Sequence, residues 1–191
     1  MSNAIEIEAK VLLSQEDYRK LIKLFPNAPR YMQTNYYIDS PERVLAKSGI
    51  ALRIREKNGQ FEMTLKTPLS QGLLEKNVPL TINEFCSYRD FNEFPKCDLK
   101  RFLTMLDFEV GDLKILTSLA TERLDVEYKG GLLSIDRNSY SGQVDYEIEF
   151  EYNNMEDAEA ILGEFLREND VPCVFSTLRK TARAMAAISK K

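Results

Sequence analysis

An α+β fold with a mainly antiparallel β-sheet is the class that this sequence of 191 residues predicts. Three observations support that class. Segments in which apolar and polar residues alternate outnumber helical segments, glycine-containing pairs suited to tight turns separate some neighbouring segments, and helical periodicity is confined to a few short stretches. Strands joined by tight turns run antiparallel, so hairpins dominate the predicted sheet.

About eight segments alternate with a period of two and are the expected strands. They are residues 4–12, 34–39, 50–57, 60–67, 73–80, 121–129, 132–138 and 144–152. Helical spacing follows Ser14, covers residues 98–108, follows Asn154 and runs from Ser176 to the end of the chain. Ser14, Asn154 and Ser176 are credible N-caps, because their side-chain oxygens can accept a hydrogen bond from a free amide at the start of a helix.

The pair Asn58-Gly59 predicts a two-residue type I′ turn between two strands. Closing the hairpin there places Arg55 opposite Glu62 and Ile54 opposite Met63. Arg53 then faces Thr64, and Leu52 faces Leu65. One face of this hairpin is therefore apolar and the other mostly charged.

The pair Gly130-Gly131 can close a second hairpin in the same way. This closure places Val126 opposite Ile135 and Asp125 opposite Asp136. Again the apolar residues share one face of the hairpin and the charged residues the other.

The composition excludes several kinds of site. Histidine is absent, so no metal site with histidine ligands and no nucleophile activated by histidine can be built. Lys and Arg total 26 against 30 Asp and Glu, a net charge of -4, which gives no overall attraction to nucleic acid or to an anionic membrane. Chemistry must therefore use carboxylates, Lys, Arg or an oxygen-bound metal.

The cysteine pattern and the start of the chain indicate a reducing compartment. Cys86, Cys97 and Cys173 are odd in number and lack a Cys-x-x-Cys spacing, so they are expected to be reduced thiols. Neither a signal peptide nor an apolar run of spanning length is seen, and we expect a cytoplasmic protein. Without a linker, residues 1–191 are expected to form a single domain, apart from an expression remnant allowed for within residues 1–4.

Charged residues fill the polar faces of the predicted strands, with little Ser, Thr or Asn between them. The rows are Glu6, Glu8 and Lys10; Arg53 and Arg55; Glu62, Thr64 and Lys66; Arg123, Asp125 and Glu127; and Asp145, Glu147, Glu149 and Glu151. A solvated sheet face is the simplest interpretation. However, a row of like charges repels itself unless opposite charges face it, and a sheet closed into a barrel brings rows of both signs together.

Such a lumen suits a chain of phosphates bridged to a metal. Carboxylate rows bind hard cations such as Mg²⁺ or Mn²⁺ through oxygen alone. Arg binds phosphate oxygens in a bidentate manner and Lys binds them as a point charge.

The motifs that carry these charges resemble those of the CYTH, or triphosphate tunnel metalloenzyme, family, from about residue 5 to 185. They are Glu6-Ile7-Glu8-Ala9-Lys10, the stretch 36–41 running on to 49–55, Thr64-Leu65-Lys66, the strand with Glu75, Arg123, Ser134-Ile135-Asp136, Glu147-Ile148-Glu149 and Lys180. The resemblance includes class IV adenylate cyclases and thiamine triphosphatases. It implies a closed eight-stranded antiparallel barrel with flanking helices.

The resemblance also implies roles for individual residues. Glu6, Glu8, Glu147 and Glu149 would hold the metal, with Asp136 assisting and Glu75 orienting one of the cations. Phosphate oxygens would be bound by Lys10, Arg53, Arg55, Lys66, Arg123 and Lys180. Glu6, Glu8 and Lys10 would be the catalytic set. Because Asp145, Glu147, Glu149 and Glu151 share one face, the ligand pair could also include Glu151.

Three other features receive structural interpretations. Tyr36-Tyr37 is expected to pack rather than to stack on a base. The basic and aromatic residues between Phe85 and Phe102 are expected to form an amphipathic helical cover. The basic residues near the carboxy terminus other than Lys180 are expected to face solvent or to complement a helix end; they are Arg179, Arg183, Lys190 and Lys191.

The leading functional hypothesis is a triphosphatase that depends on Mg²⁺ or Mn²⁺ and acts on a small triphosphate compound, with no nucleic-acid or membrane partner. A class IV-type adenylate cyclase is the second hypothesis, since it would use nearly the same charged residues. The third is a module that binds triphosphate or nucleotide without turnover. The sequence gives neither the physiological triphosphate nor the oligomeric state.

Overall fold

The computed structural model describes residues 2–70 and 72–188, with side chains from residue 7 onward. Its sheet contains nine strands within that range. They are β1 (Ser2–Glu6), β2 (Glu8–Leu13), β3 (Arg30–Asp39), β4 (Ala51–Lys57), β5 (Gln60–Pro68), β6 (Leu73–Leu80), β7 (Lys114–Tyr128), β8 (Gly131–Tyr140) and β9 (Gln143–Glu151). The helices are α1 (Gln15–Ile22), α2 (Val44–Lys47), α3 (Ile82–Phe91), α4 (Asp98–Met105), α5 (Met155–Glu168) and α6 (Lys180–Ile188).

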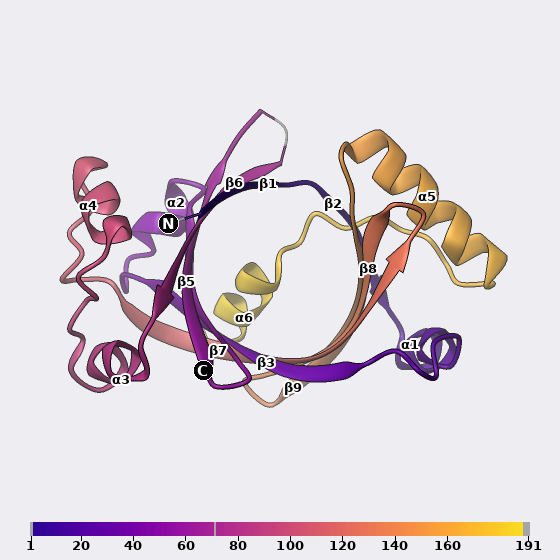
Figure 1. Cartoon of the computed structure of the whole chain (residues 1–191), viewed down its shortest axis with the longest axis horizontal. Coiled ribbons are helices and arrows are strands. Elements are labelled where there is room, and N and C mark those ends of the chain that lie inside the picture. Colours follow the sequence, from indigo (N-terminus) through magenta and orange to yellow (C-terminus); the bar gives the residue numbers. More distant parts are fainter. Residues whose placement is uncertain (1, 71, 189–191) are drawn as a thin grey trace.

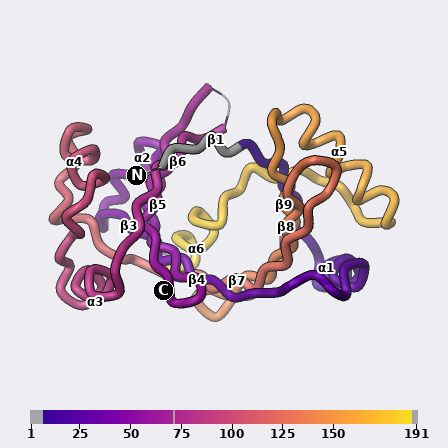
Figure 2. Tube along the Cα trace, in the orientation of Figure 1, coloured from indigo at the N-terminus to yellow at the C-terminus, as the bar shows by residue number. Residues whose placement is uncertain are grey.

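The strand order is β1-β6-β5-β4-β3-β7-β8-β9-β2, and each of these pairs is antiparallel. The two strands that end this order are consecutive in the chain, separated only by Ile7. The first predicted strand is thus split in two: β1 pairs with β6 and β2 pairs with β9. The strands curve around a central space in both views (Figure 1, Figure 2), and the α+β class is confirmed.

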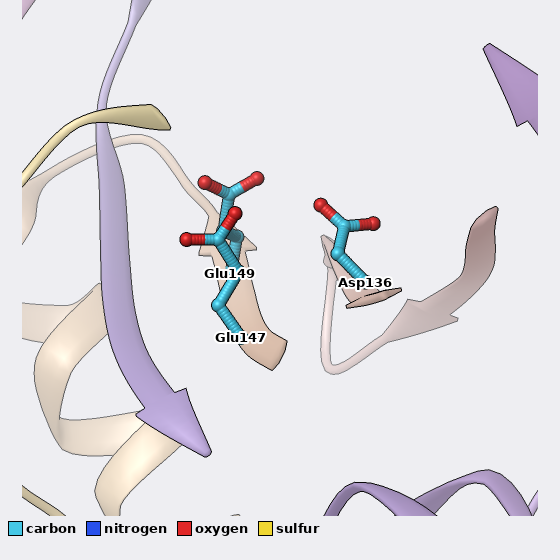
Figure 3. Close-up of side chains that lie close together, drawn as sticks. All are labelled: Asp136, Glu147 and Glu149. Atoms are coloured by element: carbon cyan, nitrogen blue, oxygen red, sulfur yellow. The ribbon is translucent and has the colours of Figure 1, made fainter. Parts of the chain in front are cut away.

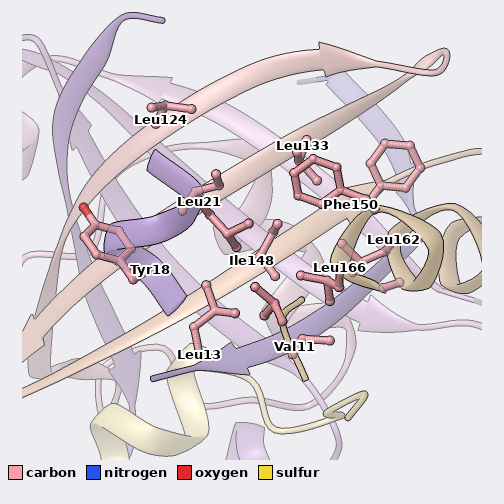
Figure 4. Packing of buried hydrophobic residues seen from close by; sticks show 14 of the residues in the cluster. Val11, Leu13, Tyr18, Leu21, Leu124, Leu133, Ile148, Phe150, Leu162 and Leu166 are labelled. Carbon is pink, nitrogen blue, oxygen red and sulfur yellow. The ribbon is translucent and has the colours of Figure 1, made fainter. Parts of the chain in front are cut away.

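Helices cover the outer face of the sheet on two sides (Figure 1). α1 and α5 pack on the β2, β8 and β9 side, where Leu21 and Leu162 are buried with Ile148 and Phe150 (Figure 4). A second apolar cluster lies under α2, α3 and α4, where Phe85 and Leu99 are among the buried residues, which confirms the predicted helical cover. Burial of these clusters supplies the main driving force for folding.

α6 differs from the other helices because it lies inside the curve of the strands (Figure 1). Its Ala184 and Ala187 pack against Tyr37, Leu119 and Tyr140. Tyr37 is fully buried there, and Tyr36 contacts the Phe85 ring, so the packing predicted for both tyrosines is confirmed.

The helix starts were predicted with mixed success. Ser14 and Asn154 are N-caps, each accepting a hydrogen bond from the amide three residues later. The prediction for Ser176 is wrong, because α6 begins at Lys180. The Ser176 amide instead donates to the Lys10 carbonyl at 2.9 Å, which keeps this segment extended beside β2.

The two predicted hairpins also differ. The register closed by Asn58-Gly59 is confirmed, and both turn residues have positive φ. The register predicted for Gly130-Gly131 is wrong, because the turn is Lys129-Gly130 and Tyr128 pairs with Gly131. Gly131 lies in the strand, at a position that favours glycine because a Cβ atom there would come within 2.5 Å of the Glu151 carbonyl oxygen and the Phe150 ring. Arg123, and not Asp125, therefore faces Asp136.

Candidate active site

A polar cavity of about 290 Å³ lies on the inner face of the sheet. Most of the predicted site residues line it: Glu8, Lys10, Arg53, Arg55, Lys66, Glu75, Arg123, Glu149 and Lys180. Asp136 and Glu147 lie behind this lining and are completely buried. The side chain of Glu6 falls outside the described residues.

The first wall of the cavity, the acidic wall, is built from β2, β8, β9 and the start of α6. Asp136 on β8 and Glu147 and Glu149 on β9 form its acidic cluster (Figure 3). Each contributes one oxygen, and these oxygens all lie within 4.8 Å of one another. Three convergent carboxylate oxygens suit Mg²⁺ or Mn²⁺, so the residues present fit such a metal.

Two cations from neighbouring strands hold this cluster from the side. The Arg123 guanidinium donates to Asp136 Oδ1 at 2.8 Å and Oδ2 at 2.6 Å, and to Glu149 Oε2 at 2.8 Å. Lys10 Nζ lies 2.8 Å from Glu149 Oε1 and 2.7 Å from Glu8 Oε1. The predicted Glu8 and Lys10 are thereby joined to the acidic cluster.

Two further cations come from α6. Lys180 Nζ lies 2.9 Å from Asp136 Oδ2 and 2.8 Å from Glu149 Oε1, and it also contacts Glu147 Oε1. Arg183 donates to Glu147 Oε2 at 2.7 Å. The prediction that Arg183 faces solvent or complements a helix end is wrong: it lies on the buried face of α6, one turn after Lys180.

The electrostatic effect of this pairing is large. Burial alone would raise the pKa of Glu149, but Lys180, Lys10 and Arg123 outweigh burial and hold that pKa well below its usual range. For Lys180, burial would lower the pKa, but Glu149, Asp136 and Glu147 raise it above its ordinary value. Glu149 and Lys180 therefore remain charged at neutral pH.

The second wall, the basic wall, is built from β4, β5 and β6. Lys66 Nζ lies 2.6 Å from Glu75 Oε1, and Arg53 lies 3.9 Å from the same oxygen. Glu75 pairs with Lys66 across the strands, so its side chain faces the cavity. Burial would raise the pKa of Glu75, but Lys66 and Arg53 lower it.

Cations repel one another on the basic wall. The pKa of Arg55 is lowered to about 10, chiefly by repulsion from Arg53 and then by burial. Arg55 Nε donates to Asn35 Oδ1 at 3.2 Å, whereas Arg53 Nε is buried and has no hydrogen-bond partner among the described residues. An anion in the cavity would offset the repulsion between these cations and give Arg53 Nε a hydrogen-bond partner.

The cavity also contains residues that were not predicted as part of the site. Asp125 accepts hydrogen bonds from the Tyr31 hydroxyl and, at 2.7 Å, from the Ser134 hydroxyl. Asp125 follows Arg123 on the same charged face, so the alternation did place it inward. Tyr31 could not be predicted, because it precedes the alternating segment that identified β3.

No helix within the described residues combines the length and the apolarity that a membrane crossing requires.

Comparison with known proteins identifies the family. The family model described as CYTH domain matches residues 4–180. The Bacillus subtilis (strain 168) protein named "Putative triphosphatase YjbK" is 32% identical over 174 residues, which are 90% of each chain.

Solved structures agree with this result. The crystal structure of "a putative adenylate cyclase" from Bacillus halodurans is 36% identical, with a TM-score of 0.88 over 96% of this chain and 98% of that chain. "Putative adenylyl cyclase HpAC1" from Hippeastrum shares the fold at 23% identity, with a TM-score of 0.77 over 95% and 96% of the two chains. The family match and the 32% identical relative show that the chain belongs to the CYTH domain family.

Proposed function

We propose that this protein hydrolyses a small triphosphate compound in a reaction that depends on Mg²⁺ or Mn²⁺. The observation that carries the proposal is one cavity with two different walls: an acidic wall with convergent carboxylate oxygens and a basic wall with surplus cations. A triphosphate bridged to a divalent metal needs both kinds of wall. The name of the YjbK relative supports the same reaction.

We further infer that the sheet closes into the predicted barrel. The N-terminal segment supports closure, because β1 and β2 are consecutive and pair with β6 and β9 respectively. The cavity would then be the lumen of a tunnel, with α6 filling part of the space within the strands (Figure 1). A closed wall would exclude bulk water and strengthen every charge interaction within.

The basic wall would bind the substrate. Arg53, Arg55 and Lys66 would contact phosphate oxygens and stabilise the negative charge that develops on the transferring phosphoryl group. Lys10 and Arg123 would contribute from the opposite wall, where carboxylates already orient their side chains. These positions would hold the phosphate chain in line with the attacking water.

The metal would be held by carboxylates of the acidic wall: Glu6, Glu8, Asp136, Glu147 and Glu149, with Glu75 orienting a cation from the basic wall. When bound, a divalent cation supplies charge neutralisation at phosphate oxygens and a lower pKa for a coordinated water. Since the chain has no histidine, a carboxylate that lines the cavity and does not hold the metal would accept the proton of the attacking water.

Adenylate cyclisation is the second candidate. It is favoured by the name of the Bacillus halodurans relative, which is 36% identical over nearly the whole chain. The same residues would then bind the triphosphate of ATP, while the ribose 3′-hydroxyl in place of water would attack the α-phosphate. The products would be cyclic AMP and pyrophosphate.

Product analysis tests the proposal. The purified protein is incubated separately with inorganic triphosphate, thiamine triphosphate and ATP, each with Mg²⁺ or Mn²⁺. We expect metal-dependent release of orthophosphate that is lost in Glu8→Gln and kept in Glu168→Gln, a matched change at an exposed carboxylate on α5. Formation of cyclic AMP and pyrophosphate from ATP would contradict hydrolysis and show that the protein is a cyclase. Metal-dependent binding without any product would replace it with a binding module.

A further inference from the structure

Lys180 occupies the centre of the acidic cluster. Its ammonium contacts Asp136, Glu147 and Glu149, the three residues whose oxygens converge for a metal (Figure 3). An ammonium and a divalent cation cannot share this centre, because they repel each other and need the same oxygens. The lysine and the metal are therefore alternative occupants of this centre.

Cations other than Lys180 also hold the three carboxylates of the cluster. Glu147 Oε2 accepts from Arg183 at 2.7 Å, and Glu149 Oε2 accepts from Arg123 at 2.8 Å. Arg123 Nε also donates to Asp136 Oδ1 at 2.8 Å. Two of the oxygens that Lys180 contacts also have other donors: Asp136 Oδ2 accepts from Arg123 at 2.6 Å, and Glu149 Oε1 accepts from Lys10 at 2.8 Å. The three carboxylates would thus keep their orientation after the ammonium leaves, as the ligands of a preorganised metal site do.

The cavity also offers space for the Lys180 ammonium. It is the first residue of α6 and lines the cavity, with 11% of its side chain exposed. A lysine carries its ammonium on a flexible stem of about four carbons, so the ammonium can move while the helix stays in place. Phosphate oxygens in the cavity would then replace the carboxylates as its partners.

We propose that Lys180 is an internal cation that keeps the metal site assembled without metal, and that a divalent cation displaces its ammonium into the cavity. The displaced ammonium then binds a phosphate oxygen of the substrate, a step that rests on the proposed function. Displacement concerns only this chain and the metal. It implies that Lys180 contacts the triphosphate only after the metal has bound, because its ammonium becomes available only after displacement.

Direct metal binding tests the displacement. Calorimetry with Mn²⁺ and no substrate compares the unmodified protein with Lys180→Met. We expect the variant to bind Mn²⁺ about tenfold more tightly or better, because the metal no longer competes with an ammonium. Lys23→Met, a matched change at an exposed lysine, should leave the affinity unchanged. Equal or weaker binding by Lys180→Met would overturn the proposal.

Thermal unfolding distinguishes a folding defect of Lys180→Met from a change in its metal binding. Lys180→Met leaves three buried carboxylates short of a cation, so its Tm without metal should fall. Saturating Mn²⁺ should then raise the Tm of the variant by more than it raises that of the unmodified protein. If the variant is unfolded without metal, Mn²⁺ should restore the fold, and failure to restore it would overturn the proposal.

Nuclear magnetic resonance follows the unmodified chain. Lysine carbons are labelled with ¹³C, and the ε-carbon signal of Lys180 is assigned by comparison with Lys180→Arg. Mg²⁺ should shift this signal, and an unmoved signal would contradict displacement. Since none of these measurements uses a triphosphate, failure of the proposed hydrolysis would leave them valid, and their failure would leave hydrolysis untouched.

Discussion

The two walls of the cavity differ in how completely their charges are paired. On the acidic wall, Asp136, Glu147 and Glu149 each contact at least two cations. On the basic wall, Lys66 and Arg53 both lie near Glu75, and repulsion from Arg53 lowers the pKa of Arg55 to about 10. Repulsion between its arginines therefore lets the basic wall accept an anion, whereas the described charges of the acidic wall are paired and, in our proposal, a metal binds there by displacing one cation.

The difference bears on how each wall should respond to mutation. Removing a partner from a balanced buried network leaves an uncompensated charge and is costly. Removing one of several repelling cations relieves strain but weakens the binding of an anion. The following predictions test this contrast.

The largest effect is expected from Glu149→Gln on the acidic wall. It removes the carboxylate that Lys10, Arg123 and Lys180 share. We expect Mn²⁺ affinity and turnover of triphosphate to fall by about 100-fold or more, because a metal ligand and the partner of three cations are lost together. Calorimetry and phosphate release measure the two effects. Activity near that of Glu168→Gln would show that Glu149 is not a ligand.

Arg183→Met should reduce stability. Glu147 is completely buried and would lose the partner of its Oε2 oxygen. We expect the free energy of unfolding in metal-free buffer to fall by about 3 kcal/mol, a typical cost of breaking a buried ion pair. Urea denaturation measures this change. A loss within the range of surface substitutions, about 0.5 kcal/mol, would contradict the pairing.

Arg53→Met should have opposite effects on stability and binding. Loss of its repulsion should raise the pKa of Arg55 and stabilise the protein without ligand by about 1 kcal/mol. The KM for triphosphate should rise by about tenfold, because a phosphate-binding cation is lost. Thermal unfolding and steady-state kinetics measure the two effects. A variant that is less stable without ligand would show that the basic wall carries no net repulsion.

The smallest effect is expected from Glu75→Gln, through the pH dependence of stability. The pKa of Glu75 is lowered from its ordinary value of 4.5 in the folded protein. Its contribution to stability is therefore present above pH 4.5 and is lost as the pH falls below that value towards the lowered pKa. Denaturation at a series of pH values should show a shallower acid loss for Glu75→Gln, by about 1 kcal/mol or less. An unchanged slope would place Glu75 outside the charge network.

Strand periodicity predicted much of the fold and of the site, because a period of two decides which side chains share a face. It placed Arg53, Lys66 and Glu149 on charged faces that the structure brings to one cavity. It could not decide which rows face each other, since strand order is set by contacts distant in sequence. Although the register predicted at Gly130-Gly131 is wrong, each side chain was still assigned to the correct face of the sheet. The predicted pairing was shifted by two residues, and side chains two residues apart in a strand share a face.

Tertiary contacts determined what local sequence could not reveal. Ser176 has the chemistry of an N-cap, but its amide is taken by the Lys10 carbonyl of a distant strand. In the sequence, Arg183 stands in a basic stretch and resembles a solvent-facing residue. In the structure, α6 lies within the curve of the strands, and Arg183 contacts Glu147. Its spacing of three from Lys180 was the available signal, because that spacing puts both side chains on one helix face.

The split first strand also affects the order in which the chain can fold. β2 precedes β9 in the chain, and Lys10 reaches its partner Glu149 across 139 positions of sequence. Contacts of such high sequence separation slow folding, because the entropy of closing a long loop is lost before the pairing forms. During synthesis the hairpin at Asn58-Gly59 can form early, because its two strands are consecutive. The edge of β2 that pairs with β9 stays unpaired until β9 has left the ribosome. Assembly of the acidic wall is therefore among the last events of folding.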